Sequence, residues 1–147
     1  MGETTSQRHS AILNGYMRGD SRFNEWAEKN LGAFRLTRWS WGELEMAWEI
    51  DDRFVMPDGV MFGGHVASAA DHVVGLAAMT VLENNEDRFR TSRLETTFFR
   101  PIVKPRAAIK ARIVNQSKSL IHVEADFSNA EGKLAARVAA VQMKRSG

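Results

Sequence analysis

The feature of this sequence with the clearest chemical potential is one carboxylate, Asp71, in a stretch that is otherwise almost wholly apolar. The stretch runs from Val66 to Leu82 and follows the paired glycines Gly63 and Gly64. The pattern predicts a helix that protein surrounds on most sides, so a carboxylate there would lose hydration at considerable cost in free energy. The start of a helix also presents unpaired N–H groups and a partial positive charge. An amide donor combined with a desolvated carboxylate indicates acyl chemistry.

Composition narrows the class of protein. The chain has 147 residues, 44% of them hydrophobic and 26% charged, which fits one globular core. It has no cysteine, so disulfides, thiolate catalysis and cysteine-bound zinc are excluded. The formal charge is only +2 and the basic residues are dispersed, so we expect no nucleic-acid partner. No secretory signal or convincing membrane span is recognised, so we expect a cytoplasmic protein that does not bind membranes.

The elements that must position Asp71 follow from the apolar periodicity. Two apolar clusters, at 11–17 and 23–31, are separated by Gly19 and predict two N-terminal helices. Leu44, Met46, Trp48 and Ile50 alternate with polar residues and predict a half-buried strand. Further strands are predicted at 35–41, 91–100, 109–113, 121–127 and 134–143.

These elements predict an α+β fold in which a curved antiparallel sheet wraps one long central helix. The connections between the last strands are of hairpin length, which favours antiparallel pairing. A long apolar helix must be covered, so the sheet is expected to curl around it. We expect residues 1–33 to form an N-terminal helical extension and residues 34–147 to form the main domain.

The chain resembles the hotdog-fold acyl-CoA thioesterases, in particular the phenylacetate-pathway and 4-hydroxybenzoyl-CoA group. The family stretch Asn-Pro-x-Gly-x-x-His-Gly-Gly, followed two helical turns later by an acidic residue, is similar to 56–64 followed by Asp71. A family strand ending Phe-x-Arg-Pro is similar to 98–101, and an acidic-glycine turn before the last strand is similar to Glu131-Gly132. The resemblance covers about 36–143 and implies the hotdog fold and hydrolysis of acyl-CoA without a metal or an organic cofactor.

The resemblance also implies roles for individual residues. Asp71 would act as nucleophile or as general base for water, and the Gly63 N–H would hold the developing oxyanion. Gly64 would leave room for the thioester, and Thr91 lies ten residues before Pro101, where relatives often carry Ser or Thr facing the acyl pocket. Where the family has Asn and His, this chain has Met56 and Phe62, which would give a more apolar pocket for substrate. Arg100, Lys104, Arg106 and Lys118 are candidates to meet the phosphates of CoA.

The spacing of Gly63 and Asp71 predicts an oligomer. Eight residues on one helix correspond to about 12 Å along the axis, which is too far for both groups to serve one carbonyl. Two antiparallel helices from neighbouring chains would supply both groups, and symmetry would create two equivalent sites. We therefore expect a homodimer or a dimer of dimers.

Other interpretations remain open. Asp71 could belong to a narrow solvated strip with Ser68, His72 and Gly75. His65 and His72 share a helix face, but without an i,i+4 pair or a second cluster we expect no metal site. The same scaffold could serve a non-catalytic acyl-CoA or aromatic-ligand binding protein, an interpretation favoured by Met56 and Phe62. A hotdog hydratase acting on enoyl thioesters is a third possibility, although the site stretch lacks the His–Asp pairing usual in those enzymes.

Overall fold

A computed structural model describes residues 3–145 of the chain. Two helices come first, α1 (Gln7–Arg18) and α2 (Arg22–Asn30), and the long helix α3 (Gly63–Met79) comes after two strands and a short 3-10 turn, η1 (Asp52–Phe54). The strands are β1 (Phe34–Ser40), β2 (Glu43–Glu49), β3 (Arg88–Phe98), β4 (Arg106–Gln116), β5 (Leu120–Ser128) and β6 (Leu134–Arg145). They form one six-stranded antiparallel sheet in the order β1-β2-β4-β5-β6-β3.

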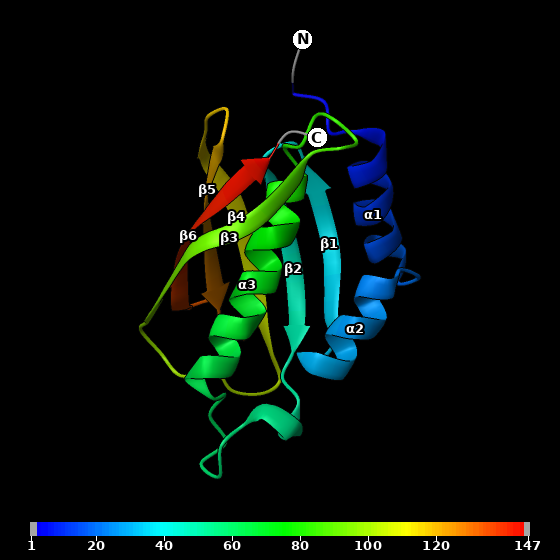
Figure 1. Cartoon of the computed structure of the whole chain (residues 1–147). Coiled ribbons are helices and arrows are strands. Elements are labelled where there is room, and N and C mark those ends of the chain that lie inside the picture. Colours follow the sequence, from blue (N-terminus) through cyan, green and yellow to red (C-terminus); the bar gives the residue numbers. More distant parts are fainter. Residues whose placement is uncertain (1–2, 146–147) are drawn as a thin grey trace.

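The sheet curves around α3, while α1 and α2 lie beside β1 (Figure 1). The predicted α+β architecture is therefore confirmed. Local sequence explains the helix ends: Ser21 caps α2 through a capping box with Asn24, and α1 ends at Gly19, whose φ of 80° favours glycine.

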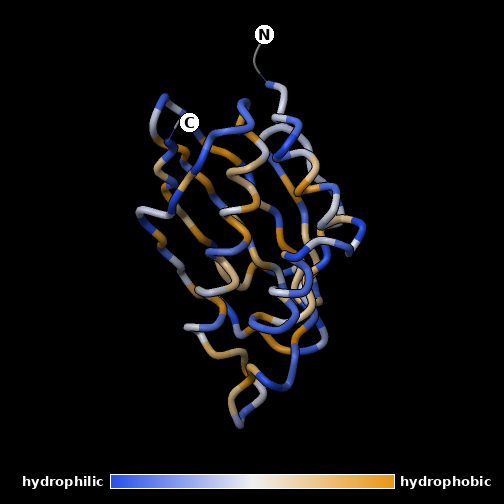
Figure 2. The backbone as a smooth tube through the Cα atoms, turned by 45° about the vertical axis from the view of Figure 1, so that its right-hand side comes forward, coloured by the Kyte–Doolittle hydropathy of each residue, from blue (hydrophilic) through white to orange (hydrophobic). Residues whose placement is uncertain are grey.

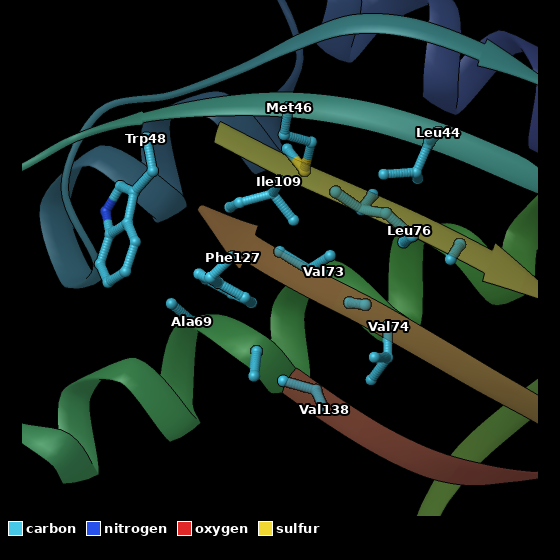
Figure 3. Packing of buried hydrophobic residues seen from close by; sticks show 14 of the residues in the cluster. Leu44, Met46, Trp48, Ala69, Val73, Val74, Leu76, Ile109, Phe127 and Val138 are labelled. Carbon is cyan, nitrogen blue, oxygen red and sulfur yellow. The ribbon is translucent and has the colours of Figure 1, made fainter. Parts of the chain in front are cut away.

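The core lies between α3 and the concave face of the sheet. The inner face of α3 presents apolar side chains, among them Ala69, Val73, Val74 and Leu76, which point toward apolar side chains from β2, β4, β5 and β6 (Figure 3). In β2 the predicted alternation is present, since Leu44, Met46 and Trp48 are buried while the residues that alternate with them, Glu43, Glu45, Ala47 and Glu49, are at least partly exposed. Coloured by hydropathy, the backbone is orange along the inner segments and blue at many outer turns (Figure 2).

One side of α3 is left uncovered by residues 3–145. Gly64, Ser68 and Asp71 are exposed and lie at i, i+4 and i+7, so they form a single line along the helix, here called the polar strip. The prediction that the folded chain would surround and desolvate Asp71 is therefore wrong for one chain. Apolar residues fill most of the other faces of α3. For this reason the sequence pattern predicted a helix that protein surrounds on most sides.

The N-terminal helices are tied to the main body at both ends. The Ser6 N–H donates to the Leu82 carbonyl at 2.8 Å, and Ser6 also caps α1. Tyr16 of α1 is buried and belongs to the same apolar cluster as the sheet and α3. No helix within residues 3–145 is long and apolar enough to cross a membrane.

β3 forms one edge of the sheet and contains a bulge. Among residues 3–145 it pairs with β6 alone, and the register shifts between Thr91 and Arg93, so Ser92 is an extra residue. The bulge changes which residues face α3. Before it the facing residues are Phe89 and Thr91, and after it they include Phe98, whose ring lies 3.5 Å from the place where a Cβ of residue 63 would be.

Candidate active site

Two of the predicted site residues, Asp71 and Thr91, are brought together by the fold. The Thr91 hydroxyl donates to Asp71 Oδ1 at 2.7 Å, joining the middle of α3 to the edge strand β3. A short hydrogen bond to a carboxylate fixes the direction in which its oxygens point. The second oxygen, Oδ2, has no hydrogen-bond partner among residues 3–145, so it remains available to a ligand or to water.

Sequence reasoning missed a third member of this group, Gln142. Its side chain is fully buried, and its Oε1 lies 3.1 Å from the Thr91 hydroxyl oxygen. The hydroxyl has one hydrogen, which it donates to Asp71 at the shorter distance, so the hydrogen-bond chain is complete when the amide oxygen and nitrogen of Gln142 are exchanged and Nε2 donates to Thr91. That orientation also gives an acceptor to Nε2, which otherwise has no partner in the interior. A chain of hydrogen bonds therefore runs from Gln142 through Thr91 to Asp71.

The other half of the site is the start of α3. Gly63 is the first residue of the helix, and Phe62 precedes it without a side-chain cap. Within residues 3–145 the N–H groups of Gly63 and Gly64 find no acceptor, and they carry the positive end of the helix dipole. This arrangement suits an anionic oxygen.

The position of the Phe62 ring explains why residue 64 is glycine. A Cβ there would lie 2.8 Å from the Phe62 ring, which is too close for the ring to stay in place. At Gly63 a Cβ would lie 3.5 Å from the Phe98 ring, an ordinary contact distance. The absence of a side chain at Gly63 therefore leaves its N–H open rather than relieving a clash.

An apolar groove adjoins the start of α3. It has a volume of about 370 Å³. Met56 lies in its wall, as the sequence suggested, whereas Phe62 and Gly64 lie outside the lining, with the Phe62 side chain 56% exposed. The lining comes from the loop before α3, from α3 itself and from the segment after β3: Met56, Val60, Met61, Gly63, Val66, Phe98, Phe99, Arg100, Pro101 and Ile102.

Within one chain the two halves of the site lie far apart. α3 is continuous from Gly63 to Met79, so Gly63 and Asp71 lie about 12 Å apart along its axis at 1.5 Å per residue. Thr91 and Gln142 lie with Asp71, while Met56 and Phe98 lie with Gly63.

The histidines of α3 face away from the polar strip. His65 stacks on Phe54 with ring centroids 3.9 Å apart, and its Nε2 lies 3.0 Å from the Leu31 carbonyl. His72 Nε2 lies 2.9 Å from the Tyr16 hydroxyl, and burial lowers the pKa of His72 to about 4 against the opposing effect of Asp71. Burial also raises the pKa of the Tyr16 hydroxyl. Both histidines therefore serve packing, and residues 3–145 hold no cluster of three groups that could bind a metal.

Comparison with known proteins identifies the class of this fold and site. The model of the thioesterase superfamily matches residues 58–136, more than half of the chain. The protein belongs to the thioesterase superfamily. The matched region contains the start of α3, Asp71 and Thr91.

A curated relative and several solved structures agree with this assignment. A protein of Saccharolobus solfataricus named as a putative esterase is 35% identical over 86 residues, which cover 58% of this chain and 60% of that protein's length. A phenylacetic acid degradation-related protein from Ralstonia eutropha JMP134 has a TM-score of 0.75 and 25% identity, with coverage of 90% of this chain and 98% of that one.

Two further structures share the fold at lower identity. A thioesterase family protein from Silicibacter pomeroyi has a TM-score of 0.78 and 20% identity, covering 92% of this chain and 99% of that one. A thioesterase protein from Streptococcus pneumoniae TIGR4, solved with coenzyme A, has a TM-score of 0.76 and 14% identity, covering 84% and 94%. The hotdog fold that the sequence predicted is therefore confirmed.

Proposed function

We propose that this protein hydrolyses acyl-CoA thioesters to a free acid and CoA, using Asp71 and the Gly63 N–H of two different chains. The observation that carries the proposal is the carboxylate of Asp71 on the polar strip, which Thr91 orients through a hydrogen bond of 2.7 Å. The same helix begins with N–H groups that are unpaired within the described chain. The neighbour from S. pneumoniae, which was solved with coenzyme A, supports the substrate class.

The proposed dimer places β3 against β3 of the second chain. β3 has eleven residues, and its outer edge carries backbone groups that pair with no other strand of the described part of the chain. Such an edge is a template for another strand. Pairing there would join the two sheets, and it would bring the polar strips of the two α3 helices face to face. Burial of Asp71 would then come from the second chain, which accounts for its exposure in one chain.

The contacts within one chain define the register of this pairing. Asp71 accepts a hydrogen bond from Thr91, and the Phe98 ring lies beside Gly63. If Asp71 approaches Gly63 of the second chain, then Thr91 must lie opposite Phe98 of that chain. The two-fold axis therefore passes midway between them on β3, close to Leu94 and Glu95.

The chemistry follows from this arrangement. The thioester carbonyl oxygen accepts from the Gly63 N–H, which stabilises the negative charge that develops on it. Asp71 of the other chain either removes a proton from an attacking water or attacks the carbonyl carbon itself. When water attacks, the carbon–sulfur bond breaks to give the carboxylic acid, and CoA leaves as the thiol with the proton that Asp71 removed from the water. When Asp71 attacks, the same bond breaks to give a mixed anhydride on Asp71, and a water molecule then hydrolyses that anhydride to the carboxylic acid and free Asp71, its proton completing the CoA thiol. The apolar groove at Met56 and Phe98 would hold a bulky or aromatic acyl group.

The test compares Asp71→Asn with the wild-type protein on a panel of acyl-CoA thioesters, with released thiol measured by a colorimetric reagent. The wild type should release CoA, and Asp71→Asn should abolish release while keeping the folded circular dichroism spectrum. Asp20→Asn, on the exposed turn between α1 and α2, is the matched control and should leave turnover unchanged. Turnover that survives in Asp71→Asn would remove Asp71 from the mechanism.

A second candidate function is binding of an acyl-CoA or an aromatic ligand without catalysis. Met56 and Phe62 favour it, because both are exposed apolar side chains at positions where the resembled family carries polar ones. This function would give thermal stabilisation by CoA esters with no thiol released from any of them.

A further inference from the structure

Gly75 is a glycine that the packing of the described chain does not explain. It lies in the interior of α3, where glycine is less favourable than alanine. Its φ is not positive, so the backbone does not require glycine. A Cβ there would lie 3.5 Å from the Phe89 ring, an ordinary contact distance, so no clash within residues 3–145 requires glycine either. The missing side chain therefore leaves open space on the surface of α3.

This open space lies one helical turn beyond Asp71. Gly75 follows Asp71 by four residues, which places it on the same face of α3 and about 6 Å further along the axis. The half-buried Phe89 precedes Thr91 by two residues in β3, and its ring lies beside Gly75 as Thr91 lies beside Asp71. Gly75 and the Phe89 ring are called here the notch. The notch therefore adjoins the candidate catalytic carboxylate, on the same surface of the chain.

The proposed dimer places the notch of one chain against the apolar groove of the other. Asp71 of one chain lies opposite Gly63 of the second, so Gly75 lies opposite Gly59, which precedes Gly63 by four residues. Val60, beside Gly59, lines the groove, and this loop continues past the start of α3 (Figure 1). The second α3 begins only at Gly63, so no helix lies opposite Gly75. Close packing of two helices therefore does not account for the glycine.

The register of β3 leads to the same place. Thr91 of one chain lies opposite Phe98 of the second, so Phe89, two residues before Thr91, lies opposite Arg100, two residues after Phe98. Phe98 and Arg100 both line the apolar groove. The helix and the strand are separate segments, and both place the notch of one chain at the groove of the other.

We infer that Gly75 of one chain, with Phe89 beside it, forms a wall of the acyl site of the other chain and determines how large an acyl group fits. This inference rests on the proposed function and names its substrate class. With the thioester carbonyl between Gly63 and Asp71, the acyl group runs through the groove to the notch. The site therefore takes acyl groups that extend about one helical turn from the carbonyl, such as hexanoyl or phenylacetyl, in preference to acetyl. A side chain at position 75 would occupy the space of the acyl group.

The experiment measures the acyl preference, defined as kcat/KM for hexanoyl-CoA divided by kcat/KM for acetyl-CoA. Gly75→Leu should lower this ratio about tenfold, an effect typical of added methylene groups in an apolar pocket. Adding Phe89→Ala to Gly75→Leu reopens the notch and should restore most of the ratio. Gly75→Ala should raise the melting temperature, because alanine favours a helix, and still lower the ratio. Gly15→Ala in α1 is its matched control, since a Cβ there also meets only ordinary contacts, and it should leave the ratio unchanged.

Binding separates this inference from the proposed hydrolysis. Asp71→Asn should bind the esters without consuming them, so calorimetry can compare hexanoyl-CoA with acetyl-CoA in this variant, with and without Gly75→Leu. Gly75→Leu should weaken hexanoyl-CoA about tenfold relative to acetyl-CoA. A shift of this binding ratio in a protein that releases no thiol would support the notch and remove the hydrolysis.

Three outcomes would overturn the inference. Gly75→Leu could leave both ratios at their wild-type values while thiol is still released, and the proposed hydrolysis would then stand without the notch. The wild-type protein could prefer acetyl-CoA to hexanoyl-CoA. Size-exclusion chromatography could show a dimeric wild type and a monomeric Gly75→Leu, which would assign Gly75 to contact between subunits instead of to the acyl group.

Discussion

Gln142 and Thr91 face each other across β6 and β3, and the hydroxyl between them connects a fully buried amide to the carboxylate of Asp71. The amide lies 3.1 Å from the hydroxyl oxygen, which lies 2.7 Å from Asp71 Oδ1. Because Gln142 is held by the interior, it fixes the rotamer of Thr91. Thr91 in turn fixes the carboxylate on the surface of α3.

Replacing Gln142 by Met should lower kcat about tenfold and leave KM for acyl-CoA nearly unchanged. Met keeps a similar volume but removes the donor to Thr91, a loss that corresponds to about one hydrogen bond. Steady-state kinetics with one acyl-CoA provide the measurement. Gln116→Met, on β4, is the matched control and should behave as wild type. Equal kcat in the Gln142 and Gln116 variants would contradict the positioning role.

Thr91→Val should lower kcat by about tenfold or more, because it keeps the shape of the side chain and removes the hydrogen bond to Asp71. Thr91→Ser keeps the hydroxyl and should recover most of the activity. Thermal unfolding of both variants separates this effect from loss of fold. If Ser and Val variants have the same kcat, the hydroxyl is not needed.

Single cysteines on β3 should report the proposed two-fold axis, since the chain has no native cysteine. Arg93→Cys, Glu95→Cys and Thr97→Cys place thiols on the outward side of the strand after the bulge. Under mild oxidation, disulfide-linked dimer should be greatest for Glu95→Cys, because a disulfide requires Cα atoms about 4.4–6.8 Å apart. Arg35→Cys on β1 should remain monomeric on a non-reducing gel. Linkage that is strongest through position 35 would place the interface on the other edge.

Gly64→Ala should lower both the melting temperature and the activity, because its Cβ would lie 2.8 Å from the Phe62 ring and force that ring to move. The double variant Gly64→Ala with Phe62→Ala removes the clash and should recover stability relative to Gly64→Ala alone. Differential scanning calorimetry of the three proteins measures the coupling between the two sites. Additive effects would show that the ring and the helix start are independent.

His72 should make the stability of the protein fall in mild acid. Burial lowers its pKa from 6.5 to about 4, against the opposing effect of Asp71, so folding favours the neutral ring. Stability is therefore complete above pH 6.5 and is lost as the pH falls toward 4, by about 2 kcal/mol at pH 5. Urea unfolding at pH 7 and pH 5 measures the difference. His72→Gln should show a smaller one, with the remaining part from His9, whose pKa burial also lowers. An unchanged difference in His72→Gln would assign the effect to other groups.

The sequence predicted the parts of the molecule that depend on local periodicity. The alternation around Leu44, Met46 and Trp48 identified β2 and its buried face, and the apolar run after Gly63-Gly64 identified α3. The hydrogen bond of Thr91 to Asp71 agrees with the position assigned to Thr91, while its catalytic use stays a prediction.

What the sequence could not predict depends on contacts between distant segments. Asp71 looked buried because most residues near it in sequence are apolar, yet those residues lie on other faces of α3. Gln142 looked like an ordinary strand residue, and only the pairing of β6 with β3 brings it to Thr91. The cluster of Arg88, Arg90, Lys144 and Arg145 is likewise assembled by that pairing, from two segments more than fifty residues apart in sequence.

The extra residue at Ser92 has a consequence for how this scaffold can vary. Thr91 and Phe98 are seven positions apart, and in a regular strand an odd separation sends two side chains to opposite faces. The bulge shifts the alternation of side chains by one residue. Both side chains therefore face α3, with Thr91 at Asp71 and Phe98 at Gly63. A chain shortened by that one residue would keep its hydrogen-bonded ladder, yet it would turn either the threonine or the phenylalanine outward. β3 should therefore tolerate the insertion or deletion of an even number of residues better than that of an odd number, because an even change keeps each side chain on its own face of the sheet.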